Sequence, residues 1–177
     1  DWPSAPTDSD GKALQTSWGP GLLRVPAYCV DRTTPITVTL PGGQTGSFYK
    51  FKFSPHKIAR INQAGIGTLG GRPMSNVDLT NGTVYLPETS NEAWLDIEGY
   101  GTPSVATSAA NTGIYSFGTA SDAIVTPVAW LKEWLSLYLE VAAADRDEAT
   151  FTDTATRVKL HRRFSEVVNS ADSVAAV

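Results

Sequence analysis

The chain has 177 residues, of which 41% are hydrophobic, and this composition fits one domain with a real core and excludes a disordered chain. Its formal net charge of −4 excludes electrostatic binding of nucleic acid by the molecule as a whole. The single cysteine, Cys29, excludes an internal disulfide framework and any multi-cysteine zinc site, and its apolar neighbours predict a buried thiol.

The first residues predict an arm followed by a hairpin. Residues 1–20 are polar and interrupted by Pro and Gly, so we expect an extended N-terminal arm. Residues 36–40 alternate apolar and hydroxyl side chains, and in residues 47–53 the aromatic side chains share one face while the lysines share the other. A short glycine-rich link joins these two runs, which indicates two antiparallel strands.

A second hairpin is predicted around Asn81 and Gly82. Residues 77–80 and 83–86 are short β-prone runs on either side of this dipeptide. Asn-Gly tolerates positive φ at both central positions, as a type I′ turn demands. We therefore expect two strands joined by a type I′ turn.

Later segments extend the β pattern. Residues 94–98, 114–117 and 134–141 are further strand candidates, the last because its leucines alternate with Trp, Ser, Tyr and Glu. Strands at this spacing, without helices between them, predict an all-β fold. We expect an antiparallel β-sandwich of jelly-roll type over residues 21–150.

The pattern changes to helical spacing at the C-terminus. Asp153 is a candidate N-cap for an amphipathic helix over residues 154–173, so residues 151–177 are expected to pack as a helix on the sandwich or on a neighbour. The opposite face of this helix is basic and could lie against RNA phosphates or an acidic partner. The candidate contact residues there are Arg157, Lys159, Arg162 and Arg163.

No complete catalytic, cofactor or metal site is visible in the sequence. The two histidines, His56 and His161, are too few for a histidine-based metal site, and His56 is expected in a loop as a solvated or backbone-bonded side chain. Residues 65–70 fit the G-x-G-x-x-G pattern, but Gly, Arg and Pro follow, so no phosphate-binding helix begins there. We expect no enzyme activity, no cofactor, no metal and no membrane span, since no stretch approaches about 18 continuous apolar residues.

One acidic strand suggests an alternative function. Asp96 and Glu98 fall on one face of the strand predicted at 94–98, roughly 6–7 Å apart at the rise per residue of a strand, a separation that glycosidases use. This run resembles the acidic strand of the laminarinase-like glycoside hydrolases, which are β-jelly rolls. In that family the nucleophile lies two residues before the Asp, and this chain has Trp94 there. The alternative is therefore a carbohydrate-binding or glycoside-hydrolase-like sandwich in which Trp94 stacks on sugar beside Asp96 and Glu98.

A second resemblance covers the last third of the chain. Residues 124–125 lead into the aromatic and apolar run 129–141, and basic helical residues follow around 157–168. This order resembles coat proteins of small icosahedral RNA viruses, of the nodavirus and tetravirus type, although the chain lacks the strongly basic N-terminal arm of that family. The resemblance implies a structural protein that assembles with copies of itself into a virion, with a possible RNA contact through the C-terminal basic face. The aromatic-rich, weakly charged composition suits such interfaces.

Overall fold

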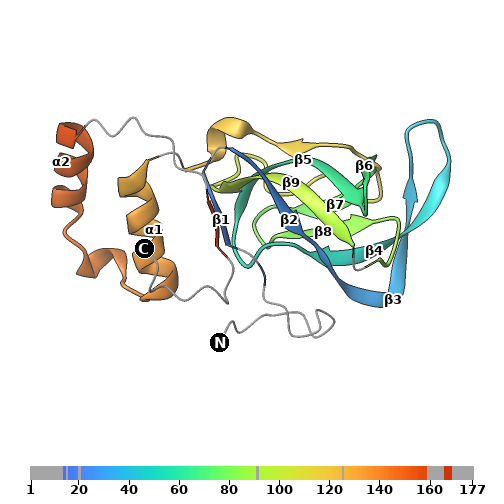
Figure 1. The fold of residues 1–177 in the computed structure, drawn as a ribbon, viewed down its shortest axis with the longest axis horizontal. Coiled ribbons are helices and arrows are strands. Elements are labelled where there is room, and N and C mark those ends of the chain that lie inside the picture. The colour runs from blue at the N-terminus through green and yellow to red at the C-terminus, as the bar shows by residue number, and fades with distance from the viewer. Residues whose placement is uncertain are drawn as a thin grey trace.

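The strands of the chain form two packed antiparallel sheets (Figure 1). The computed structural model describes residues 14, 16–19, 21–90, 92–124, 126–158 and 166–168. The first sheet has the strand order β10–β5–β9–β2, with β6 paired to β5. Its members are β2 (Leu22–Pro26), β5 (Ile58–Ile66), β6 (Leu69–Arg72), β9 (Ala93–Tyr100) and β10 (Phe117–Gly118).

The second sheet has the order β3–β4–β8–β7. Its members are β3 (Tyr28–Thr39), β4 (Thr45–Lys52), β7 (Ser75–Asp78) and β8 (Thr83–Leu86). A separate antiparallel pair joins β1 (Thr16–Trp18) to β11 (Glu166–Val168). The expectation of an all-β sandwich is therefore confirmed at the level of two antiparallel sheets.

Helices follow the sandwich and lie at one end of it (Figure 1). They are the short 3-10 turns η1 (Ala120–Asp122) and η2 (Ala143–Asp145) and the α-helices α1 (Pro127–Tyr138) and α2 (Glu148–Val158). None of the helices in the described ranges is long and apolar enough to cross a membrane.

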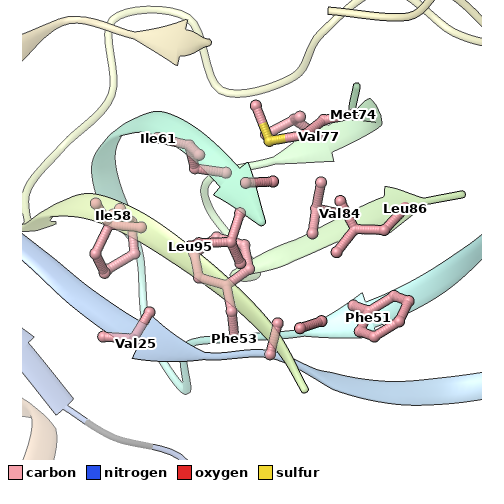
Figure 2. Close-up of a cluster of buried hydrophobic side chains, with 14 of the residues drawn as sticks. Val25, Phe51, Phe53, Ile58, Ile61, Met74, Val77, Val84, Leu86 and Leu95 are labelled. Atoms are coloured by element: carbon pink, nitrogen blue, oxygen red, sulfur yellow. The ribbon is translucent and has the colours of Figure 1, made fainter. Parts of the chain in front are cut away.

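The core lies between the two sheets. Figure 2 shows side chains from both sheets meeting there, among them Val25 and Leu95 from the first sheet and Phe51 and Val84 from the second. Cys29 belongs to the same cluster and is fully buried, as its neighbours predicted. Removal of these apolar side chains from water is the main stabilising contribution to the fold.

The two predicted hairpins are present, with one correction. The first is β3–β4, in which Ile36 pairs with Phe48. In the second, β7 and β8 are joined as expected, but Asp78 pairs with Thr83, so the loop has four residues and not two. Only Gly82 has positive φ in this loop, so the predicted type I′ turn is wrong.

The strand expected at residues 134–141 is wrong, because most of this segment lies in α1. Thr126 caps the helix by accepting a hydrogen bond from the Ala129 N–H (3.2 Å), and Pro127 occupies the first turn. Its leucines follow one another at i and i+2, which suits a strand, but also at i and i+4, which suits a helix. Of the strand expected at 114–117, only Phe117 lies in β10.

The C-terminal helix starts earlier than expected. Residue 147, not Asp153, stands before its first turn, where Asp147 accepts hydrogen bonds from the N–H and hydroxyl of Thr150 (3.1 and 2.7 Å). The described part of α2 ends at Val158, and residues 166–168 form β11, so the prediction of one helix over 154–173 is wrong. Residues 159–165 and 169–177, with most of the predicted arm, lie outside the described residues.

We predict a large difference between two leucine truncations in the first sheet. Leu95 in β9 is 0% exposed and belongs to the core, whereas Leu22 in β2 is 60% exposed. Leu95→Ala should lower the free energy of unfolding by about 2–5 kcal/mol, because the cavity adds to the lost transfer energy. Leu22→Ala should change it by less than about 0.5 kcal/mol. Urea unfolding of both variants measures the difference, and equal losses would contradict this placement of β9.

Candidate functional site

Strand β9 carries the predicted sugar-contact residues on the face opposite the core. Ala93, Leu95 and Ile97 enter the core cluster. The alternate residues Trp94, Asp96 and Glu98 lie on the other face, as the period of a strand requires. The structure therefore brings the three residues together, and their chemistry depends on the side chains that neighbouring strands place beside them.

Asp96 is held by a cation and an amide from the two adjacent strands. Arg24 in β2 donates hydrogen bonds to both carboxylate oxygens, from Nε to Oδ1 (2.8 Å) and from an Nη to Oδ2 (2.9 Å). Gln63 in β5 donates to Oδ2 at 2.7 Å. The hydrogen bond from Arg24, then that from Gln63, holds the pKa of Asp96 below its usual range. Asp96 is thus a fixed carboxylate and is poorly suited to donate a proton.

Glu98 is more deeply buried and less fully bonded. Arg60 in β5 approaches Oε1 at 3.4 Å, and the Glu98 side chain is 8% exposed. The other oxygen, Oε2, is buried and has no hydrogen-bond partner among the described residues. A retaining or inverting glycosidase needs a protonated acid and a second free carboxylate. Asp96 is committed to Arg24, and Trp94 occupies the position of the nucleophile.

Trp94 is packed into the sheet and is not an open stacking platform. It is 9% exposed, and the guanidinium carbon of Arg24 lies 3.6 Å from the centre of its ring. Its indole N–H donates to the Gly67 carbonyl at 2.8 Å. A Cβ at Gly65 would lie 2.0 Å from the Trp94 ring, and one at Gly70 would lie 3.3 Å from it.

The glycines of the G-x-G-x-x-G pattern therefore have a structural role. They form the hairpin of β5 and β6, in which Gly65 pairs with Gly70. Their missing side chains make room for the indole of Trp94 above the sheet, and Gly67, with φ of +56°, forms the turn whose carbonyl receives its N–H. The absence of a phosphate-binding helix after this pattern agrees with the sequence.

A cluster of aromatic rings at the other end of β9 connects the sandwich to α1. Trp18 of β1 stacks on Tyr100 of β9 with a ring separation of 4.8 Å. His56, in the loop before β5, lies 5.4 Å from Trp18 and 4.9 Å from Tyr100. Trp130 of α1 meets Trp18 edge-on at 5.9 Å. We call Trp18, His56, Tyr100 and Trp130 the aromatic cluster, and sequence patterns did not reveal it because its members come from four separate segments.

Polar contacts complete this connection. The Tyr100 hydroxyl donates to Glu133 of α1 at 2.7 Å, and burial together with this carboxylate raises the pKa of Tyr100 above its usual range. His56 was expected to be solvated or backbone-bonded. It is backbone-bonded, with Nδ1 at 3.1 Å from the Lys57 carbonyl, but it is buried. Burial lowers its pKa to about 4.

Helix α1 leaves much of its apolar surface accessible. None of its side chains is fully buried. Leu131 and Leu137 of the helix are 39% and 41% exposed, and Leu139 at its C-cap is 55% exposed. One face meets the aromatic cluster. Another meets the segment that follows, through the ion pair of Lys132 with Glu148 of α2 and the hydrogen bond from Arg146, which precedes α2, to the Lys132 carbonyl (2.7 Å). These leucines thus remain at the surface of a helix that already has two neighbours.

The remaining predicted contacts are only partly within the described structure. Arg157 belongs to α2, but its side chain is not described, and Lys159, Arg162 and Arg163 lie outside the described residues. Within the described ranges, no group of three or more His, Cys, Asp or Glu side chains could hold a metal ion.

Comparison of the chain with protein-family models, curated protein sequences and solved structures gives no match.

The packing of Trp94 gives a testable prediction. Gly65→Ala places a methyl group inside the indole, so the ring must move, and we expect a loss of about 1–3 kcal/mol in the free energy of unfolding. Tryptophan fluorescence of the folded variant should shift to longer wavelength as the indole meets water. Gly46→Ala in β4 is the matched control, because its added Cβ meets Phe48 at an ordinary 3.4 Å. Equal effects in the two variants would contradict the role assigned to Gly65.

Proposed function

We propose that this chain is a structural self-assembly protein that associates with further copies of itself through α1. The observation that carries the proposal is a stripe of leucines, with Leu131 and Leu135 one turn apart in α1 and Leu139, four residues further on, at its C-cap. Residues at this spacing share one face of a helix. Two of the three are more than one-third exposed. We call these residues the leucine stripe.

A second copy is the partner that this surface fits best. The leucine stripe contains no charged residue, and the neighbouring charges of α1 are used within the chain, Lys132 with Glu148 and Glu133 with Tyr100. An acidic or basic partner would therefore find no complementary charge on the stripe. A two-fold symmetric contact places the same apolar ridge on both sides, which needs no charge complementarity.

The proposal extends to a more specific role, that of a viral coat subunit located in the virion. Two packed antiparallel sheets with helices at one end are compatible with such a subunit. A jelly roll pairs strands that are distant in the chain, and β2–β9 and β4–β8 are such pairs. The local hairpins β3–β4 and β7–β8 do not distinguish a jelly roll from other sandwiches. The jelly-roll arrangement and the coat function thus remain proposals that rest on the resemblance.

The carbohydrate alternative requires a rearrangement of the β9 site. A sugar could stack on Trp94 only if Arg24 left the ring, and this would also remove the cation from Asp96. Binding on a polysaccharide array, lost in Trp94→Ala, would support a sugar-binding module in place of self-assembly. No binding on the array would exclude the polysaccharides tested.

We expect light scattering after size-exclusion chromatography to detect oligomers whose mass increases with protein concentration. Leu131→Glu combined with Leu139→Glu should shift the equilibrium to monomers, because two carboxylates would have to be buried in the contact. The matched control is Leu69→Glu with Val105→Glu, which changes two exposed apolar residues outside α1 and should leave the mass unchanged.

Three outcomes would contradict the proposal. They are a strict monomer at high concentration under all salt and calcium conditions, equal effects of the two double variants, and binding of monomers to lipid vesicles without self-association. The last would assign the leucine stripe to a lipid surface. Circular dichroism of each variant establishes that it is folded.

The proposed RNA contact is tested separately. Arg162→Ala with Arg163→Ala should leave thermal stability nearly unchanged if both arginines face solvent, as the sequence predicts, because exposed ion pairs contribute about 0–1 kcal/mol each. If the basic residues face RNA, the variant should bind RNA more weakly at low salt and show a shallower salt dependence. Unfolding of the variant would instead identify the arginines as buried structural partners, and unchanged RNA binding would remove them as contacts.

A further inference from the structure

We propose that protonation of His56 releases α1 from the sandwich, so that the contact between the helix and the sheets is sensitive to acid. The proposal rests on the aromatic cluster, in which the titratable ring of His56 packs against the residues that contact α1. This helix has no fully buried side chain of its own. The inference concerns the attachment of α1 within one chain and does not depend on self-assembly.

The hydrogen bonds of His56 fit a neutral ring. The Lys57 carbonyl, 3.1 Å from Nδ1, can only accept, so Nδ1 carries the proton of the neutral imidazole. The Ser54 hydroxyl lies 3.4 Å from the same nitrogen. The other nitrogen, Nε2, is buried and has no hydrogen-bond partner among the described residues. A second proton would therefore create a buried N–H without an acceptor, which is costly.

The charges around the ring also oppose a cation. Lys57 belongs to the same loop and Lys52 to β4, and both repel a positive imidazole. Trp18 of β1 and Trp130 of α1 bring no charge. Glu133 of α1 is the one carboxylate that the described contacts bring to the cluster, and it is bonded to the Tyr100 hydroxyl.

Attraction between an imidazolium and the neighbouring rings is too small to reverse this. Cation–π contacts contribute about 0.5–2 kcal/mol. Removing a cation from water costs several kcal/mol, and burial is the largest cause that holds the pKa of His56 near 4. The contribution of the neutral ring to stability is complete above pH 6.5, its ordinary pKa, and is lost as the pH falls from 6.5 towards 4.

The position of His56 couples this loss to α1. The ring packs against Trp18 and Tyr100, and these two residues make the described ring and hydroxyl contacts with α1, to Trp130 and Glu133 respectively. When the charged ring moves to solvent, both lose one packed neighbour. The strands of the two sheets keep their backbone hydrogen bonds and the core between the sheets, because His56 and Trp18 do not belong to that core. The helix should therefore detach before the sandwich unfolds.

The test uses the full chain with His161→Gln, which leaves His56 as the one imidazole. Its protonation is followed by NMR, and hydrogen exchange, corrected for the intrinsic effect of pH, is followed at the amides of α1, β5 and β9. We expect His56 to titrate well below pH 6.5 and the α1 amides to lose at least ten-fold in protection over the same interval, while β5 and β9 stay protected. Adding His56→Gln should remove the pH dependence of α1 protection, whereas Glu133→Gln should retain it.

Several results would overturn the inference. One is titration of His56 at pH 6.5 or above, and another is simultaneous loss of protection in α1, β5 and β9, which would indicate global unfolding. A third is a pH dependence that persists in His56→Gln or disappears in Glu133→Gln, which would assign the effect to carboxylates. If His56→Gln does not fold, the comparison of the His56 midpoint with the α1 midpoint in the His161→Gln protein decides, and midpoints more than one pH unit apart reject the coupling.

Discussion

Strand β9 is buried on both of its faces, and this places two carboxylates where neither is well solvated. Of its residues, Asp96 alone is only partly buried, and the others are buried. An ionised carboxylate in such a position needs a cation or several hydrogen bonds, because desolvation otherwise exceeds any gain from packing. Arg24 and Arg60 supply these cations from the two flanking strands. The strand order β5–β9–β2 therefore places an arginine beside each carboxylate of β9, in addition to burying the apolar residues of β9 in the core.

The same constraint explains the chemistry that β9 does not offer. Asp96 and Glu98 share one face of the strand, as a glycosidase pair would, but their electrostatics differ from those of such a pair, because Arg24 holds Asp96 ionised and also covers Trp94. The indole fits only because Gly65 leaves space in β5. Carboxylate, guanidinium, indole and glycine thus form one packed unit. Because this unit spans β2, β9 and β5, its contacts favour the observed register of these three strands, and its role is structural.

Local patterns in the sequence predicted parts of β3, β4, β7, β8 and β9, but they missed β5 and did not predict long-range contacts. Alternation identified the end of β3 and β4, since a period of two is visible in consecutive residues, and the Asn-Gly dipeptide identified β7 and β8. The pairing of Arg24 with Asp96 joins residues 72 positions apart, and no local pattern encodes it. The burial of His56 was missed for the same reason, because Trp18 and Tyr100 reach it from other strands.

The misassigned α1 segment had a different cause. Its leucines fit both a strand and a helix, and the deciding signal was Thr126 followed by Pro127, an N-cap and a first-turn proline. The four-residue loop at Gly82 shows the same ambiguity on a smaller scale. Asp78 accepts hydrogen bonds from the N–H groups of Thr80 and Asn81 (both 3.0 Å), which favours a longer loop than the Asn-Gly pair alone indicates.

Helix α1 differs from the sandwich in how its stability arises. The strands bury their apolar side chains in a shared core, whereas α1 buries none completely and depends on the aromatic cluster and α2. Regions with few buried apolar contacts open at a lower free energy than the global unfolding of a protein. Since the leucine stripe is also left partly exposed, a partner that covered it would supply the burial that the isolated chain lacks. Incomplete burial weakens the attachment of α1 within one chain, and it is also the feature on which the proposed self-association depends.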